Sequence, residues 1–182
     1  NLDWPPLYAM YTISVLREKG HEIEYSRKYK DGFDLYMFTS SIVSHETEIK
    51  EIKALKNLNK KVMVIGPYAI SNSEDYLKNN AIVIGNEPEL YFLKNPIDKI
   101  NLNEVKILSD FVGEIEIDNL PFPAWDDILK NNILSYGVLQ KKAMIPILGI
   151  RGCPYSCFHY CVYPLAQGRK VRKRSPMNIV EE

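Results

Sequence analysis

Short apolar runs alternate with amphipathic segments through the first half of the chain. Apolar residues recur at helical spacing over residues 7–19 and again over 46–58, which predicts two helices with one buried face each. Four short runs with strand-like patterning lie around them, at residues 21–26, 35–39, 62–65 and 81–84. Weaker helical patterns cover 74–78 and the residues up to Leu93. This alternation predicts an α/β domain over residues 1–94 with a parallel, doubly wound sheet.

The pattern changes after residue 94. Residues 104–111 and 114–118 flank Val112-Gly113 and predict a small hairpin. Residues 120–125 hold two prolines and indicate a linker, although an ordinary packed loop would have the same sequence. We therefore treat 95–142 as a hairpin and a proline-rich linker.

The last segment, residues 143–182, begins with an apolar run. Residues 143–150 predict a strand, which Pro146 interrupts. The run 169–174 contains five cations, and a solvated face is the first interpretation, with binding of a phosphate or acidic substrate as the alternative. Ser175-Pro176 then predicts a helix start, with serine as the cap and proline at the first helical position.

Small and polar residues follow successive predicted strands. Ligands of doubly wound sheets bind at the carboxyl ends of the strands, where such residues would lie together. The residues in question are Ser40, Ser41, Gly66, Pro67, Gly85 and Glu87. Turn formation alone would also explain these residues. Their expected position makes the carboxyl edge of the sheet a candidate binding site, but it does not indicate which ligand would bind.

Composition narrows the choice of partners. The chain has 182 residues and balances 23 basic against 23 acidic side chains, which gives no field to attract nucleic acid or an anionic membrane. No apolar run reaches the ~18 residues of a spanning helix, and no signal peptide is recognisable. Free clustered cysteines suit a reducing cytosol, so a cytoplasmic location is expected. The first residue is Asn1 instead of methionine, and we expect the chain to be a fragment.

All three cysteines of the chain lie in one nine-residue loop, at positions 153, 157 and 161. An odd, tightly spaced set makes a poor disulfide framework. His159 could complete a zinc site with the three thiolates, but structural zinc sites usually come as two separated ligand pairs. Three thiolates could instead hold an iron–sulfur cluster and leave one iron open, since four-iron clusters normally take four cysteines. Incidental or redox cysteines, zinc and iron–sulfur are thus the three alternatives.

The stretch from Arg151 to Cys161 resembles the signature loop of the radical S-adenosylmethionine enzymes. Their usual spacing is Cys-x-x-x-Cys-x-aromatic-Cys, which Cys153 and Cys157 match, and Tyr160 supplies the aromatic residue before Cys161. The second gap holds three residues here instead of two.

This resemblance implies a 4Fe-4S cluster on Cys153, Cys157 and Cys161, with S-adenosylmethionine on the open iron and Tyr160 at the cofactor. The cluster would cleave S-adenosylmethionine to a 5′-deoxyadenosyl radical. A reductant such as flavodoxin or ferredoxin would supply the electron. No catalytic side chain is predicted.

The front domain, taken with this loop, resembles the cobalamin-binding domain that precedes many radical S-adenosylmethionine domains. In that family, turns like those at residues 40–41, 66–67 and 85–87 line the corrin. The resemblance implies a Rossmann-like, flavodoxin-like sheet of the cobalamin-binding type, then a linker, then the first strand and cluster loop of a partial TIM barrel at 143–182. Methyl transfer or a rearrangement would be the reaction, and this chain alone would be inactive.

Two departures from the cobalamin-binding pattern shape what we expect. Residues 1–6 hold no histidine, so no lower cobalt ligand comes from that loop. A first, central strand is also absent, which predicts a gap in the sheet. Two alternatives belong to other classes: a tRNA methylthiotransferase-like enzyme, which usually carries further cysteines in its front domain, and a non-catalytic zinc-binding module.

Overall fold

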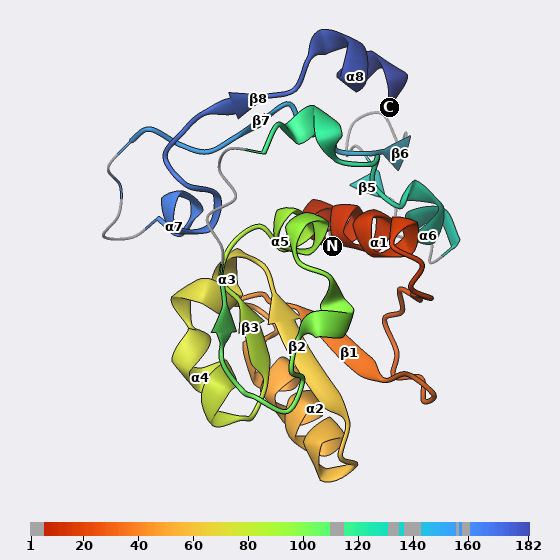
Figure 1. The fold of residues 1–182 in the computed structure, drawn as a ribbon, viewed down its shortest axis with the longest axis vertical. Coiled ribbons are helices and arrows are strands. Elements are labelled where there is room, and N and C mark those ends of the chain that lie inside the picture. The colour runs from red at the N-terminus through yellow and green to blue at the C-terminus, as the bar shows by residue number, and fades with distance from the viewer. Residues whose placement is uncertain (1–5, 110–114, 131–134, 137–142, 156, 158–160) are drawn as a thin grey trace.

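The structure is a computed structural model that describes residues 6–109, 115–130, 135–136, 143–155, 157 and 161–182. Its centre is a parallel sheet of four strands in the order β1-β2-β3-β4. The strands span Leu35–Thr39, Lys61–Ile65, Ile82–Ile84 and Ile107–Leu108. Figure 1 shows them in the lower half of the molecule, with the helices arranged around them. The predicted α/β class with a parallel sheet is therefore confirmed, and it is compatible with a Rossmann-like fold.

Side chains on alternate positions of the strands build two separate cores. Val62, Val64 and Val83 pack with the helices α2 (His45–Asn57) and α4 (Ser73–Lys78). The intervening residues of β2 and β3, which include Met63 and Ile84, pack with α1 (Leu7–Glu18) and α5 (Pro88–Lys94). Because successive side chains of a strand point to opposite faces, two buried faces need a nearly continuous apolar run. This explains why β2 reads as Val-Met-Val-Ile.

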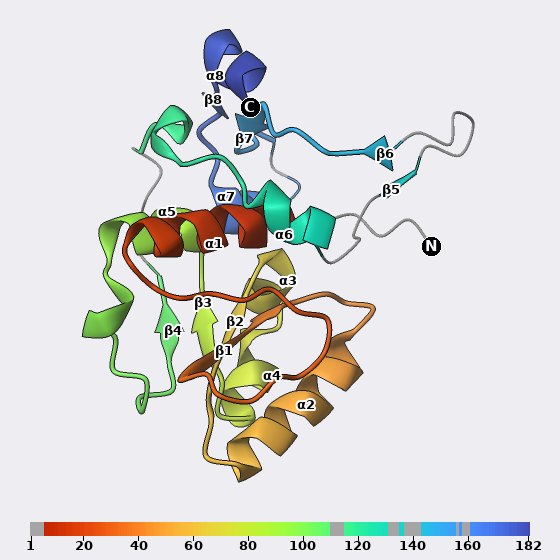
Figure 2. The same cartoon turned by 90° about the vertical axis from the view of Figure 1, so that its right-hand side faces the viewer.

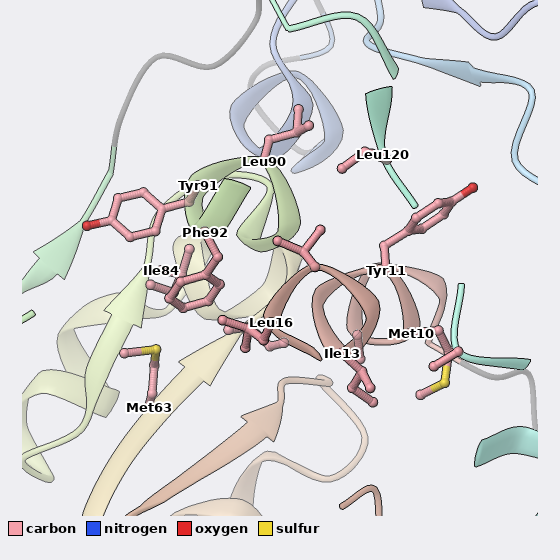
Figure 3. Close-up of a cluster of buried hydrophobic side chains, with 14 of the residues drawn as sticks. Met10, Tyr11, Ile13, Leu16, Met63, Ile84, Leu90, Tyr91, Phe92 and Leu120 are labelled. Atoms are coloured by element: carbon pink, nitrogen blue, oxygen red, sulfur yellow. The ribbon is translucent and has the colours of Figure 1, made fainter. Parts of the chain in front are cut away.

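Helix α1 has buried residues on more than one side. Figure 3 shows Ile13 and Leu16 on the side of α1 that faces the sheet, where Met63 and Phe92 also lie. Tyr11 points the other way. Tyr11 is only 1% exposed, so a second layer of chain must cover it. Helix α1 is thus an inner layer of the fold.

The covering layer comes from the last part of the chain. Strands β7 (Ile150–Arg151) and β8 (Arg172–Lys173) form an antiparallel pair, in which Arg151 lies opposite Arg172. Figures 1 and 2 show this pair with α8 (Pro176–Glu181) on the far side of α1 and α5 from the sheet. Ser175 caps α8 through Oγ, which accepts a hydrogen bond of 3.2 Å from the amide of Asn178. The predicted start of this helix is confirmed.

The remaining described elements are short. They are α3 (Pro67–Ser71), α6 (Trp125–Lys130), α7 (Tyr163–Gln167), the 3-10 turns η1 (Ile97–Lys99) and η2 (Ile117–Asn119), and the antiparallel pair β5 (Ser135–Tyr136) and β6 (Ala143–Met144). No described helix has the length and apolarity needed to cross a membrane.

Three local predictions were wrong. Residues 21–26 form no strand, yet Ile23 and Tyr25 still pack against the core from a loop. The expected gap is absent among the described strands, because β1 pairs directly with β2 along all five of its residues. Within the described part of the predicted hairpin no antiparallel pair forms: Ile107 and Leu108 extend the parallel sheet at β3, and residues 117–119 make a 3-10 turn, while residues 110–114 lie outside the described residues.

The linker and the last segment also differ from expectation. Leu120 and Ala124 belong to the main core, and the amide of Ala124 donates to the carbonyl of Met10 at 3.2 Å. Residues 120–124 are therefore a packed loop. The predicted strand at 143–150 is broken, since only 143–144 and 150 are extended in ladders. The described strands of this segment make two antiparallel pairs, and the barrel remains a prediction.

Candidate functional site

The carboxyl edge of the sheet faces the strand that leads into the cysteine loop. Gly66 and Pro67 follow β2, and Glu87 follows β3; all three line a cavity of about 210 Å³. Arg151 of β7 lines the same cavity from the opposite side, with Tyr163 and Gln167 of α7. The structure therefore brings three of the predicted strand-end residues to the segment that carries the cysteines.

The two serines after β1 instead stabilise turns. Ser40 is buried, and its Oγ accepts a hydrogen bond of 2.7 Å from the amide of Ala69. The amide of Ser41 donates to Oε1 of Glu48 at 3.0 Å, and its Oγ accepts from the amide of Val43. Neither serine lines the cavity. Their contacts are those expected of residues that shape the turn.

Gly66 lies where the chain leaves no room for a side chain. Its φ is +110°, and a Cβ there would lie 2.7 Å from the hydroxyl oxygen of Tyr8. Tyr8 also lines the cavity, and burial raises its pKa. Gly85 is equally restricted, because a Cβ would lie 2.9 Å from Cβ of Ser109. Both glycines thus permit close packing between segments of this chain.

Glu87 is fully engaged by two arginines of the last layer. Its Oε1 accepts from Nη1 of Arg151 and its Oε2 from Nη2 of Arg172, both at 2.6 Å. Arg151 also forms an ion pair with Glu89. The four side chains are between 1% and 6% exposed, so the charges are compensated inside the protein.

The pKa values in this group follow from burial and mutual compensation. Burial raises the pKa of Glu89, and Arg151 only partly offsets that effect. For Arg151, burial disfavours the cation, but Glu89 and Glu87 outweigh it and raise the pKa. Arg151 is therefore firmly charged, and it also lies over the ring of Tyr11 with 5.2 Å from Cζ to the centroid.

The basic run 169–174 is only partly a solvated face. Arg172 and Arg174 are buried, whereas Arg169, Lys170 and Lys173 are exposed. Arg174 donates to the carbonyl of Leu148 at 3.0 Å and to the hydroxyl of Tyr11 at 3.2 Å. The predicted solvated face was therefore wrong at residues 172 and 174. Alternate side chains of an extended segment point to the same face, and here both point inward, to acceptors on other segments.

The cysteine loop begins at a fixed point. Gly152 has φ +83°, and a Cβ there would lie 2.1 Å from the carbonyl oxygen of Lys170. The amide of Cys153 then donates to the carbonyl of Gly168 at 3.1 Å. Strand β7 and the first cysteine are thus held against the chain that returns from the loop.

The three thiols are free and half-buried. The amide of Cys161 donates to the carbonyl of Cys157 at 2.9 Å, so the backbones of these two cysteines are joined. His159 and Tyr160 lie outside the described residues. Within the described residues, no three His, Cys, Asp or Glu side chains converge closely enough to hold a metal ion.

A second polar group lies beside the turn after β1. Oε2 of Glu48 accepts from the hydroxyl of Tyr76 at 2.6 Å. That hydroxyl lies 3.1 Å from Nδ1 of His45, whose Nε2 lies 2.7 Å from Oδ2 of Asp75 and 3.1 Å from Nδ2 of Asn72. Both ring nitrogens of His45 are thus engaged within the front domain.

Sequence reasoning did not identify Tyr8, Glu89, Arg151 or Arg172 as parts of this site. Two signals were present: a second carboxylate two residues after Glu87, and arginines at the alternate positions 172 and 174. Both patterns are common in exposed segments. They indicate a buried site only when the oppositely charged partners of these residues are known.

No protein-family model matches the chain, and no curated protein matches it significantly. Function must therefore be inferred from the residues and their arrangement.

Proposed function

We propose that this chain carries the cluster-binding loop of a radical S-adenosylmethionine enzyme, with an α/β domain in front of it. The observation that carries the proposal is the placement of the cysteine loop. Its strand β7 lies against the carboxyl edge of a parallel sheet, where ligands of such sheets bind, and Arg151 joins the two through Glu87. A cofactor on the loop would then lie next to a ligand edge supplied by another part of the chain.

The donor set suits iron. Cys153, Cys157 and Cys161 are the only thiols in the sequence, none is in a disulfide, and each is partly accessible. Soft thiolates select iron–sulfur clusters or zinc, and three of them would leave one iron of a four-iron cluster for a non-protein ligand. Bound there, the cluster would supply one electron for the reductive cleavage of S-adenosylmethionine, received from a flavodoxin- or ferredoxin-like donor.

The chain's own residues would hold and shield this centre. Gly152 and the amide of Cys153 fix the start of the loop, and Gln167 accepts from the amide of Gly152 at 3.3 Å. The apolar side chains of Leu148 and Ala166 line the adjoining cavity, which would limit access of water to that side.

Anaerobic reconstitution with iron and sulfide tests the proposal. We expect about four irons per chain and a visible absorption band, with electron paramagnetic resonance after reduction. Replacing any one of the three cysteines by serine should lower the iron content strongly, whereas His159→Ala should not. Stoichiometric zinc in place of iron, lost in His159→Ala, would establish a zinc module and refute the proposal.

Cobalamin is the second cofactor that the resemblance implies, and the cavity does not fit it as it stands. Pockets for drug-sized ligands measure about 300–1,000 Å³, and a corrin is larger than such a ligand. The cavity measures about 210 Å³, and Glu87 at its wall is already bound to two arginines. Cobalamin binding would therefore require the last layer to move away from the sheet edge.

A further inference from the structure

The ion pairs around Arg151 join three segments that are distant in sequence. Glu87 and Glu89 come from the start of α5, Arg151 from β7 and Arg172 from β8. Two carboxylates face two guanidinium groups, so the group is balanced when all four are charged. All are almost fully buried, and removal of one charge would leave another uncompensated inside the protein.

Arg151 is two residues from the first cysteine, and the chain between them cannot adjust freely. Gly152 adopts a left-handed conformation, and the Lys170 carbonyl lies where a side chain would begin. Cys153 is then held through its amide by Gly168. A shift of Arg151 must therefore be passed on to Cys153.

Arg172 fixes the same point from the other strand. It lies opposite Arg151 in the β7–β8 ladder, and its Nη2 donates to the carbonyl of Gln167 at 2.8 Å as well as to Glu87. The single carboxylate of Glu87 thus holds both strands at the base of the cysteine loop. Among the described strands, β7 and β8 pair only with each other, so the ladder alone gives them little support.

We infer that Glu87, assisted by Glu89, is a positioning residue for the cysteine loop: through Arg151 and Arg172 it fixes β7, β8 and the first cysteine against the sheet edge. The carboxylate acts from the front domain on a loop more than sixty residues away in sequence. Only the consequence for a bound cluster rests on the function proposed above; the effect on the loop itself does not.

Amide hydrogen exchange on the metal-free chain tests the inference directly. In Glu87→Gln, we expect the Cys153 amide to exchange at least ~10-fold faster than in the wild type, while amides of β2 keep their rates. Glu87→Asp, which retains the charge, should restore much of the protection. Asp127→Asn is the matched control, because Asp127 is equally buried, at 5% exposed, and pairs with Arg17 of α1 at 2.5 Å. It should leave the Cys153 amide unchanged.

Two results would overturn the inference: a Cys153 exchange rate in Glu87→Gln within ~2-fold of the wild type, or equal acceleration in Asp127→Asn. If Glu87→Gln fails to fold, exchange of the Cys153 amide is measured in Arg151→Lys instead. Lysine keeps the charge but lacks the planar group that reaches two carboxylates, so we expect faster exchange than in the wild type, and an unchanged rate would overturn the inference. In reconstituted protein, Glu87→Gln should also shift the cluster's reduction potential. Wild-type protein that binds no iron would refute the proposed function, while the exchange rates would still decide the role of Glu87.

Discussion

The hydroxyl of Tyr76 in α4 donates a hydrogen bond of 2.6 Å to Oε2 of Glu48 in α2. Tyr76 is fully buried and Glu48 is 5% exposed. The other carboxylate oxygen accepts from the amide of Ser41 at 3.0 Å and from the hydroxyl of Ser44. A buried carboxylate in the front domain is therefore satisfied by groups that also hold the turn after β1 in place.

Replacing Tyr76 by phenylalanine removes the donor to a buried carboxylate oxygen. We expect Tyr76→Phe to lower the free energy of unfolding by about 1–3 kcal/mol. Tyr36→Phe is the matched control, since its hydroxyl donates to the Lys30 carbonyl in an exposed position, and it should cost less than about 0.5 kcal/mol. Urea denaturation measures both. Equal losses in the two variants would contradict a special role for the buried contact.

The stability of the protein should fall in alkaline solution because of Tyr11. Burial raises the pKa of Tyr11 from 10.0 to about 12, with Glu182 adding to the effect. The folded state thus holds this proton more tightly than the unfolded chain, and the advantage is lost as pH rises above 10. We expect Tyr11 to account for about 1 kcal/mol of lost stability between about pH 9 and pH 11.

The comparison with Tyr11→Phe isolates this contribution from other titrating groups. The difference in unfolding free energy between wild type and variant should shrink by that amount as the pH rises over the same range. A difference that stays constant with pH would show that Tyr11 ionises normally in the folded protein.

Gly152 and Gly168 offer a matched pair for testing the start of the cysteine loop. Both have positive φ, +83° and +75°, so alanine at either position pays a backbone cost of about 1–2 kcal/mol. Only at Gly152 would the new Cβ meet a backbone atom, the Lys170 carbonyl oxygen; Gly168 has open space. Gly152→Ala should therefore be more destabilising than Gly168→Ala by at least ~1 kcal/mol in urea denaturation. Equal costs would mean that the β7–β8 ends can separate freely.

If the front domain binds cobalamin, we expect no imidazole from residues 1–6 or from His45 on the cobalt. Residues 1–6 contain no histidine, and both ring nitrogens of His45 are engaged with Tyr76, Asp75 and Asn72. Titration with hydroxocobalamin followed by absorbance measures binding. Absence of binding at micromolar concentration would reject cobalamin, and nitrogen hyperfine splitting from an axial imidazole in the reduced cobalt state would reject a histidine-free site.

Local sequence patterns predicted the central elements well. The strand expected at 35–39 has those bounds, and the amphipathic helix expected at 46–58 is found at His45–Asn57. Residues 21–26 show why alternation can mislead. Ile23 and Tyr25 are partly buried against the core, and Arg17 binds the Ile23 carbonyl at 2.7 Å, but residues 21–26 pair with none of the described strands. The alternation of apolar and polar residues there indicated which side chains are buried, although the segment forms no strand.

The candidate site was predictable only where it is local. Cys153, Cys157 and Cys161 are recognisable from spacing within one loop, and their possible cluster stays a prediction. The partners of Glu87 lie 64 and 85 residues away, so no window of sequence contains the contact. For the same reason the run 169–174 was interpreted as solvent-facing: two of the acceptors, Glu87 for Arg172 and Tyr11 for Arg174, lie on segments far earlier in the sequence.

The contact between Arg174 and Tyr11 spans 163 residues, nearly the whole chain. A ribosome releases the front domain first, and its sheet can close before β8 exists. The cysteines then emerge on a segment that has no docked strand beside it until residues 172–174 follow. The front domain alone therefore cannot fix the start of the cysteine loop, and β8 is the last piece that this region needs.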